Sequence, residues 1–312
     1  MRVVFFGTPA FAVPTLDALL STSHTVVGVV TQPDRPRGRG QKTTASPVKA
    51  AAVAAGLPVL QPASARTSEF GDELGALSAD VGVVAAYGQI LTQQLLDTPQ
   101  LGMVNVHASL LPRYRGAAPV HRAVINGDAE TGVTIMKMVK ALDAGPMLAA
   151  ERLPIGPDET SDQLEAHLAR MGATLLVKTL AAIAEGTTVP VAQDDSQATY
   201  ARKLEKADSR VDWQWPAVRI HNLIRGLHPW PHATTLAEGK RLILHRSRLA
   251  GGTSSQPPGT VIESVGEHVR VATGDGMLDL TELQAEGGRP MSAREFLSGH
   301  SLPAGTLLTP AT

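Results

Sequence analysis

The first half of the chain alternates short apolar runs with longer segments in which apolar residues recur at helical spacing. The apolar runs are RVVFF at 2–6, TVVGVV at 25–30, VGVVAAY at 81–87, MVNVHAS at 103–109 and TGVTIMKM at 131–138. Helix candidates between them include residues 10–21 and 46–56. Strands that are apolar on both faces and separated by helices are typical of a parallel sheet covered on both sides. The pattern therefore predicts an α/β domain.

Residues 160–186 predict one long helix. Thr160 and Gln163 have the spacing of a capping box, and Gly186 follows the last apolar position. The apolar residues that share one helical face are Leu164, Leu168, Met171 and Leu175. We interpret this helix as the closing element of the first domain.

The composition changes after this helix. We predict a catalytic domain at 1–188, a polar linker at 189–209 and a second domain at 210–312. The second domain opens with a helix candidate at 215–230, in which Pro216 lies near the first turn. The strand candidates that follow lie at 241–250, 259–264, 268–273 and 277–283. Short strands at regular spacing predict a small β-barrel.

The overall composition excludes several classes of protein. The chain has 312 residues, 43% of them hydrophobic, and a formal net charge of −1, so it is not a bulk-basic protein. It has no cysteine, which excludes disulfides, thiolate nucleophiles and cysteine-ligated metals. Neither a cleavable leader nor an apolar run of about 18 residues is present, so we expect a cytoplasmic protein.

Charge is distributed unevenly in the second half. Residues 202–250 contain ten Lys or Arg against four Asp or Glu, whereas residues 251–312 contain three against seven. We expect one face or end of the second domain to be positive. That face is either an ordinary solvated surface or a surface that binds a polyanion.

The N-terminal stretch FFGTPAF resembles the start of a dinucleotide-binding unit, because a glycine follows the first strand. The stretch lacks G-x-G-x-x-G, and Pro9 stands where backbone amides would bind a pyrophosphate. A nicotinamide-dependent oxidoreductase is therefore not predicted.

The stretch NVHASLLPRYRGAAP at 105–119 carries the main candidate chemistry. Asn105 and His107 are two positions apart on a predicted strand, so their side chains lie on one face. If the strand ends there, both lie at the carboxyl edge of the sheet, where open α/β folds place ligands. A carboxamide beside an imidazolium forms a two-donor site for an oxyanion. The alternative is a pair of polar residues that bond to local backbone.

Asp143 is the candidate partner of the imidazole. It lies in KALDAGPML, after the strand candidate at 131–138, and Gly145 indicates a loop. A carboxylate near His107 would favour the protonated ring. An aspartate before a glycine is also a common turn residue, and this alternative stays open.

These stretches resemble the folate-dependent formyltransferase family, over essentially the whole chain. The resemblance rests on NVHASLLPRYRGAAP, on GDAETGVTIM and LDAG downstream, on TQPDRPRGRGQK at 31–42 and on KLEKADSRVDW at 203–213. The arginine-rich insertion at 33–43 and the second domain are typical of the members that use tRNA. The chain departs from the family pattern at Ala144, where threonine is common, and at Pro146, where an acid is common.

The resemblance implies a Rossmann-like formyltransferase domain followed by an OB-like β-barrel domain that holds tRNA. It implies that Asn105, His107 and Asp143 are catalytic. The implied contacts to reduced folate are Ser109, Leu110, Leu111 and Pro112. The implied contacts to tRNA are Arg39, Lys42 and Lys206.

The resemblance also implies the reaction. The α-amine of initiator methionyl-tRNA attacks the formyl carbon of 10-formyltetrahydrofolate, the co-substrate, without a metal or a covalent enzyme intermediate. We expect a monomer. Two alternatives stay open: a relative that formylates a small amine or hydrolyses formylfolate, and a non-catalytic module that binds tRNA.

Overall fold

The computed structural model describes residues 1–37 and 42–311. The chain forms two compact units. The sheet unit comprises residues 1–116, 131–153 and 165–200, and the barrel unit comprises 117–130, 154–164 and 201–312. Among the described residues, none of the helices is both long and apolar enough to span a membrane. The predicted limits at 188 and 209 remain a proposal about folding domains.

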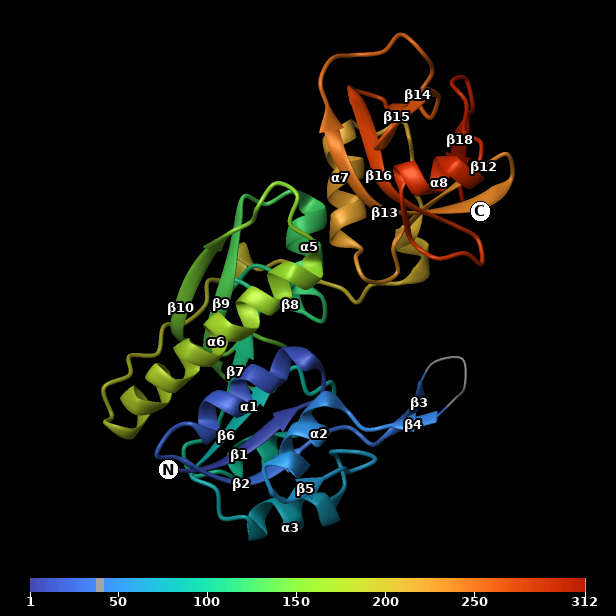
Figure 1. The fold of residues 1–312 in the computed structure, drawn as a ribbon. Helices are drawn as coiled ribbons and strands as arrows, with labels where there is room; N and C mark the ends of the chain where they lie inside the picture. The colour runs from blue at the N-terminus through green and yellow to red at the C-terminus, as the bar shows by residue number, and fades with distance from the viewer. Residues whose placement is uncertain (38–41, 312) are drawn as a thin grey trace. The chain divides into compact units, whose positions relative to one another are not determined.

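The sheet unit is built on seven strands in the order β10-β9-β7-β6-β1-β2-β5 (Figure 1). The strands are β1 (Arg2–Gly7), β2 (Thr25–Val30), β5 (Val59–Leu60), β6 (Val81–Ala85), β7 (Met103–His107), β9 (Glu130–Lys137) and β10 (Met147–Pro154). The run from β5 through β2, β1 and β6 to β7 is parallel. The α/β prediction is therefore confirmed.

One strand differs from the predicted parallel arrangement. β9 runs antiparallel to β7, with His107 opposite Thr134 and Val104 opposite Lys137. The chain leaves β7 at its carboxyl end and enters β9 at that same end, so it never crosses the length of the sheet. A parallel neighbour would need a crossover that returns the chain to the other edge. The segment from 108 to 129, which contains the eight-residue helix α5 (Pro119–Asn126), does not make that return.

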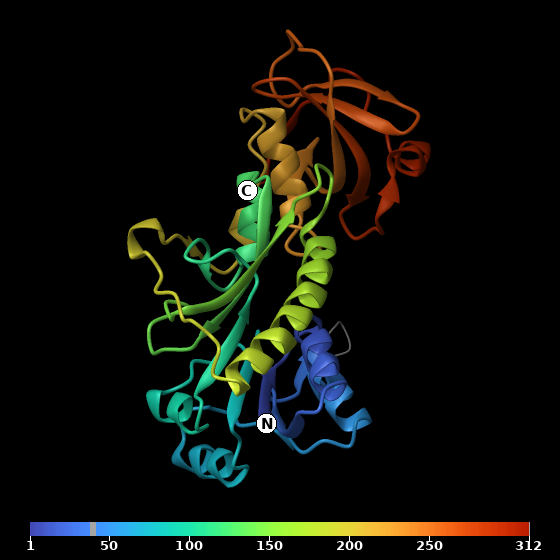
Figure 2. The same ribbon diagram turned by 90° about the vertical axis from the view of Figure 1, so that its left-hand side faces the viewer.

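Helices cover both faces of this sheet. The helices with a part in the sheet unit are η1 (Ala10–Ala12), α1 (Val13–Leu20), α2 (Pro47–Ala54), α3 (Ser68–Ala76), α4 (Gln93–Asp97), α6 (Ser161–Ala184) and η2 (Asp195–Gln197). On one face, Phe6 contacts Phe70 of α3 and Tyr87 edge-on. On the other face, α6 approaches so closely at Gly172 that an added Cβ would lie 2.7 Å from Val106. Figures 1 and 2 both show α6 running along β7 and β9.

The predicted long helix is present as α6. Its Gln163 side chain accepts a hydrogen bond from the backbone N–H of Thr160 at 3.1 Å, as a capping box requires. The short strands β3 (Arg35–Arg37) and β4 (Lys42–Thr44) form a hairpin in the basic insertion. The remaining short strands are β8 (Arg115–Gly116) and β11 (Tyr200–Ala201).

The barrel unit is an antiparallel sheet in the order β14-β15-β16-β13-β12-β18, with β17 added to β16. Its strands are β12 (Ala233–Ala237), β13 (Lys240–Ala250), β14 (Val261–Val265), β15 (His268–Ala272), β16 (Met277–Ala285), β17 (Met291–Ser292) and β18 (Leu308–Pro310). The sheet curls far enough for Thr260, before β14, to bridge Leu307, before β18. The predicted barrel is therefore confirmed as an antiparallel half-barrel.

The helices of the barrel unit are α5, η3 (Lys206–Ser209), α7 (Ala217–Gly226) and α8 (Ala293–Gly299). The core that they share with the sheet centres on Trp213, Ile220 and Leu244. α5 and α7 meet closely, because a Cβ added to Gly226 would lie 2.5 Å from the Ile125 side chain. The predicted helix at 215–230 is shorter than expected, because the chain after Gly226 turns away into a His-Pro-Trp-Pro-His segment.

Candidate active site

Asn105 and His107 lie at the carboxyl end of β7, in the middle of the sheet unit. Asn105 is level with Val84 of the parallel neighbour β6, and His107 is the last residue of its strand. Alternation along a strand places their side chains on one face and that of Val106 on the other. Because Val106 faces α6, the two polar side chains point to the opposite face. This is the arrangement that the strand period predicted.

The ring of His107 is buried, and its tautomer is determined by a backbone contact. Nε2 lies 2.9 Å from the carbonyl oxygen of Tyr114. A carbonyl can only accept, so Nε2 carries hydrogen and donates. The ring therefore presents Nδ1 to any reacting group, and Nδ1 can donate only when the imidazole is protonated.

Asp143 lies beside that second nitrogen. Its Oδ2 is 3.8 Å from Nδ1 of His107, within ion-pair range but beyond a hydrogen bond. The same oxygen accepts the backbone N–H of Gly116 at 2.8 Å. Asp143 has a φ of +49°, a conformation that non-glycine residues rarely adopt and that often marks functional loops. The structure thus places Asp143, the third residue predicted to be catalytic, beside His107.

The backbone around Asp143 is held by Gln193, a residue that no sequence motif singled out. Its Nε2 donates to the carbonyl oxygens of Asp143 at 2.8 Å and of Gly145 at 2.7 Å. Its Oε1 accepts from Nε and Nη2 of Arg115, at 3.1 and 2.9 Å. Both ends of the carboxamide are therefore in use. The sequence gives no local signal for Gln193, because it lies in a polar segment that carries little periodicity.

The carboxamide of Asn105 differs from that of Gln193 in its hydrogen bonding. The side chain is half-buried, and within residues 1–37 and 42–311 it forms no hydrogen bond. Its N–H groups are consequently available to a ligand at the sheet edge. A preorganised amide donor beside a cationic ring is an arrangement that stabilises a developing negative oxygen.

The stretch Ser109–Pro112 forms a tight loop. The Ser109 hydroxyl donates to the carbonyl oxygen of Arg113 at 2.6 Å, so this donor serves the loop itself. Thr134 of β9 bridges the loop, since its hydroxyl donates to the Ser109 carbonyl and accepts from the Leu111 N–H. Leu110 and Pro112 are partly exposed, and Leu111 is buried. The four predicted folate contacts stay a prediction.

Tyr87 and Ile90 follow β6, the strand next to β7. Tyr87 is buried, and burial raises the pKa of its hydroxyl to about 12. Among the described residues, this hydroxyl is one of three buried side-chain polar atoms that lack a hydrogen-bond partner. Ile90 is 67% exposed, so it is available at the surface of this loop.

Side-chain contacts of Asp34 fix the start of the basic insertion at 33–43. Oδ2 of Asp34 binds Nζ of Lys49 at 2.6 Å, and Oδ1 accepts from Gln61 at 2.8 Å. The hydrogen bonds from these two partners lower the pKa of Asp34. Of the predicted tRNA contacts, Arg39 lies outside the described residues. Lys42 begins β4, and only its backbone is described.

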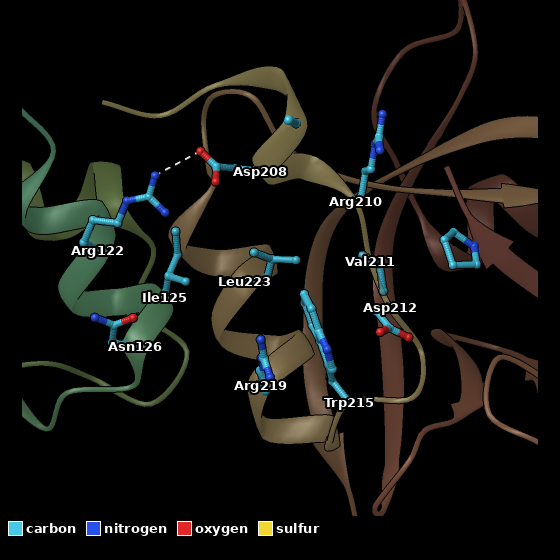
Figure 3. A pocket seen from close by; sticks show the side chains of 12 residues that line it. Arg122, Ile125, Asn126, Asp208, Arg210, Val211, Asp212, Trp215, Arg219 and Leu223 are labelled. Carbon is cyan, nitrogen blue, oxygen red and sulfur yellow. Dashed lines mark hydrogen bonds and ion pairs between the residues drawn. The ribbon is translucent and has the colours of Figure 1, made fainter. Parts of the chain in front are cut away.

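The barrel unit contains a cavity of about 600 Å³ between α5, η3 and α7 (Figure 3). The guanidinium carbon of Arg219 lies 3.8 Å from the ring centroid of Trp215 in its wall. Arg122, in the same wall, is bound to Asp208 at 3.0 Å. The predicted contact Lys206 is exposed in η3, next to the lining residue Ala207. An aromatic ring beside cations suits the base and phosphate of a nucleotide.

Comparison with known proteins matches both units. The Formyl transferase family model matches residues 1–180, and the model for the Formyl transferase C-terminal domain matches residues 203–301. The fold resembles an N-formyltransferase from Helicobacter canadensis solved with folinic acid and dTDP-3-aminofucose, with a TM-score of 0.68 and 18% identity over 90% of this chain and 98% of that chain. The sheet, the half-barrel and the polar strand end thus define the formyl transferase class.

Two sequence relatives identify the family to which the chain belongs within this class. The methionyl-tRNA formyltransferase of Trichlorobacter lovleyi is 51% identical over 99% of this chain and 97% of its own length. That of Heliobacterium modesticaldum is 50% identical over 98% of this chain and 99% of its own length. The chain belongs to the methionyl-tRNA formyltransferase family, and it is an enzyme.

Proposed function

We propose that this enzyme transfers the formyl group of 10-formyltetrahydrofolate to the α-amine of initiator methionyl-tRNA, in translation initiation. The proposal rests on one observation about the site. The Asn105 amide, which has no partner among the described residues, lies on the same strand face as His107, and Nδ1 of His107 is 3.8 Å from the Asp143 carboxylate. The sequence relatives name the tRNA acceptor, and this geometry supplies the groups that the reaction needs.

In the proposed reaction, the amine nitrogen adds to the formyl carbon, and the carbonyl oxygen becomes negative. The Asn105 N–H and the protonated Nδ1–H of His107 donate to that oxygen. Losing one such donor typically lowers the rate about 10²–10³-fold. Asp143 orients the ring for this role, because its carboxylate lies within ion-pair range of Nδ1.

The proton balance involves the same carboxylate. The attacking amine loses one proton as its bond to carbon forms, and the folate nitrogen gains one as its bond to carbon breaks. Asp143 accepts the amine proton, directly or through water, and that proton then passes to the folate nitrogen as it leaves. Alignment of amine and formyl carbon supplies further acceleration.

We propose separate binding roles for the two units, folate in the sheet unit and tRNA in the basic insertion and the barrel unit. We propose that Ser109, Leu110, Leu111 and Pro112 contact the folate through their backbone and apolar atoms, because the Ser109 hydroxyl is engaged with Arg113. For tRNA we propose Arg39 and Lys42 in the insertion, and Lys206 with the Trp215–Arg219 cavity in the barrel unit. Such phosphate contacts weaken as salt rises.

A single-turnover assay with formyl-labelled folate and charged initiator tRNA tests this proposal. Wild-type enzyme should transfer label to the aminoacyl-tRNA, and His107→Ala should reduce the rate by about 10²–10³-fold. His24→Ala, at a histidine remote from β7, is the control and should keep the wild-type rate. Full activity of His107→Ala would refute the assignment of the site.

The same assay separates the alternatives. Transfer of label to a small amine in preference to tRNA, or release of formate alone, would indicate the small-amine transferase or the hydrolase. Tight binding of tRNA with no turnover of formylfolate would indicate a binding module.

A further inference from the structure

Three histidines of the barrel unit converge at one point. His228 and His232 lie in the turn between α7 and β12, and His245 lies in β13. One ring nitrogen from each lies within 4.8 Å of the corresponding atoms of the other two. The His232 and His245 ring centroids are 4.3 Å apart. In the sequence alone, these residues stand out only as histidines within the basic stretch at 202–250.

Two of the rings are oriented by oxygen acceptors on their outer side. Nδ1 of His228 lies 3.0 Å from Oδ1 of Asp162. Nε2 of His245 lies 2.8 Å from Oε1 of Gln284. The Gln284 amide is itself oriented, because its Nε2 donates to the carbonyl oxygen of Gly288 at 2.9 Å.

These contacts decide which nitrogens carry hydrogen. An oxygen acceptor at Nδ1 of His228 makes that nitrogen the donor and leaves a lone pair on Nε2. By the same argument, Nε2 of His245 donates to Gln284, and Nδ1 of His245 keeps a lone pair. A histidine that gives one N–H to a carboxylate or amide oxygen and has a lone pair on the other nitrogen is the usual form of a metal ligand.

His232 supplies the second observation. Its Nδ1 is buried and has no hydrogen-bond partner among the described residues. Buried polar atoms are nearly always satisfied, so an orphaned nitrogen on a ring that packs against two other imidazoles calls for an explanation. His232 also has a φ of +63°, a backbone conformation that costs free energy for most non-glycine residues.

The site is enclosed but not sealed. The His245 ring is buried, whereas the His228 side chain is 19% exposed and His232 is half-buried. An ion can therefore enter from the side of the turn. Three atoms no more than 4.8 Å apart share a point within about 2.8 Å of each, compared with about 2.0–2.1 Å for a zinc–imidazole bond. Small side-chain rotations close that difference.

We propose that His228, His232 and His245 form a binding site for a divalent transition metal, of which Zn²⁺ is the expected ion. Nε2 of His228, Nδ1 of His245 and one nitrogen of His232 supply three ligands, and water completes a tetrahedral set. The ion ties the turn between α7 and β12 to β13. Its role is structural, and it takes no part in formyl transfer.

Metal titration of the full chain tests the proposal. The protein is prepared without a polyhistidine tag, stripped with a chelator and titrated with Zn²⁺ in competition with a chromophoric chelator. Co²⁺ titration reads the geometry, since a tetrahedral three-histidine site gives intense visible bands and hydrated Co²⁺ does not. We expect one ion per chain, and a rise in Tm with Zn²⁺.

Variants assign the ligands. His245→Gln and His232→Gln should each weaken Zn²⁺ binding by about 100-fold or more. Asp162→Asn leaves all three rings in place and alters the outer contact to His228, so it should weaken binding by about 10-fold. His268→Gln, at a histidine of β15 bound to Glu263, is the matched control and should bind like wild type. Circular dichroism of each stripped variant confirms folding.

Two results would overturn the proposal, and the first needs only the wild-type protein. Wild-type protein that gives only the Co²⁺ spectrum of the hydrated ion has no such site. Zn²⁺ binding that is equally tight in wild type, His245→Gln and His232→Gln places the ion elsewhere. In either case the three rings are a packed cluster that holds no ion.

Discussion

The side-chain amide of Gln193 lies 2.8 Å from the carbonyl oxygen of Asp143, fifty positions away in the chain. The same amide bonds to Gly145 and receives two hydrogen bonds from Arg115. Gln193 thus connects a guanidinium to the loop that carries a proposed catalytic carboxylate. Because it touches only backbone there, it acts by positioning Asp143.

Gln193→Ala should therefore lower kcat by about 10-fold or more, since small displacements of a catalytic group are costly. KM for charged tRNA should change little, because no tRNA contact is proposed at this residue. Steady-state kinetics measure the changes in kcat and in KM separately, and thermal unfolding measures any general loss of stability. Gln197→Ala, in the same polar segment and with its side chain bonded to Asp194, is the control. Equal kinetics for both variants would remove the positioning role.

Asp143→Asn tests the charge at the site while keeping its shape. An amide oxygen can still accept the Gly116 N–H, but the negative charge beside Nδ1 of His107 is lost. We expect the single-turnover rate to fall about 10²-fold or more, as when a general acid–base group is lost. Asp72→Asn, on the exposed side of α3, should keep the wild-type rate. A wild-type rate for Asp143→Asn would limit this carboxylate to a turn-forming role.

The raised pKa of the Tyr87 hydroxyl predicts that the free energy of unfolding depends on pH. Burial raises the pKa of its hydroxyl from 10.0 to about 12, so the folded state disfavours the phenolate. Stability is then fully present below pH 10 and falls between pH 10 and 12, by about 2–3 kcal/mol for this residue. Urea unfolding at pH 9 and at pH 11.5 should show a larger loss in wild type than in Tyr87→Phe.

The same substitution removes a buried hydroxyl for which the described part of the chain offers no hydrogen-bond partner. Tyr87→Phe should therefore leave the free energy of unfolding at pH 7 unchanged or raise it by about 1 kcal/mol. Tyr200→Phe, at a side chain 68% exposed, is the control and should follow wild type at every pH. A Tyr87→Phe protein that loses as much stability as wild type at high pH would contradict the assignment.

Arg219→Ala tests the cavity of the barrel unit. If the guanidinium over Trp215 meets a phosphate, its loss should weaken tRNA binding and reduce the salt slope of log K by about one. Filter binding of charged tRNA at a series of salt concentrations measures that slope. Arg289→Ala, at an exposed arginine paired with Glu295, should leave the slope unchanged. An unaltered slope for Arg219→Ala would place the tRNA contacts of this unit elsewhere.

The periodicity of the sequence by itself specifies much of the sheet unit. The strand period placed Asn105 and His107 on one face, and the helical period and capping spacing placed α6 close to its observed bounds. Asp143 was found because its loop follows a strand and carries a glycine. These inferences succeed because they rest on local geometry, which a short stretch of sequence specifies by itself.

Contacts through the backbone and between distant segments were decided only by the tertiary structure. The carbonyl of Tyr114 selects the His107 tautomer, yet every residue has a carbonyl, so no residue type signals that role. Gln193 reaches the Asp143 loop across fifty positions. His245 meets His232 because the antiparallel register of β12 and β13 pairs Ala233 with Leu244, one position away from each. Such pairings depend on strand register and on which distant segments meet, and one short stretch of the chain specifies neither.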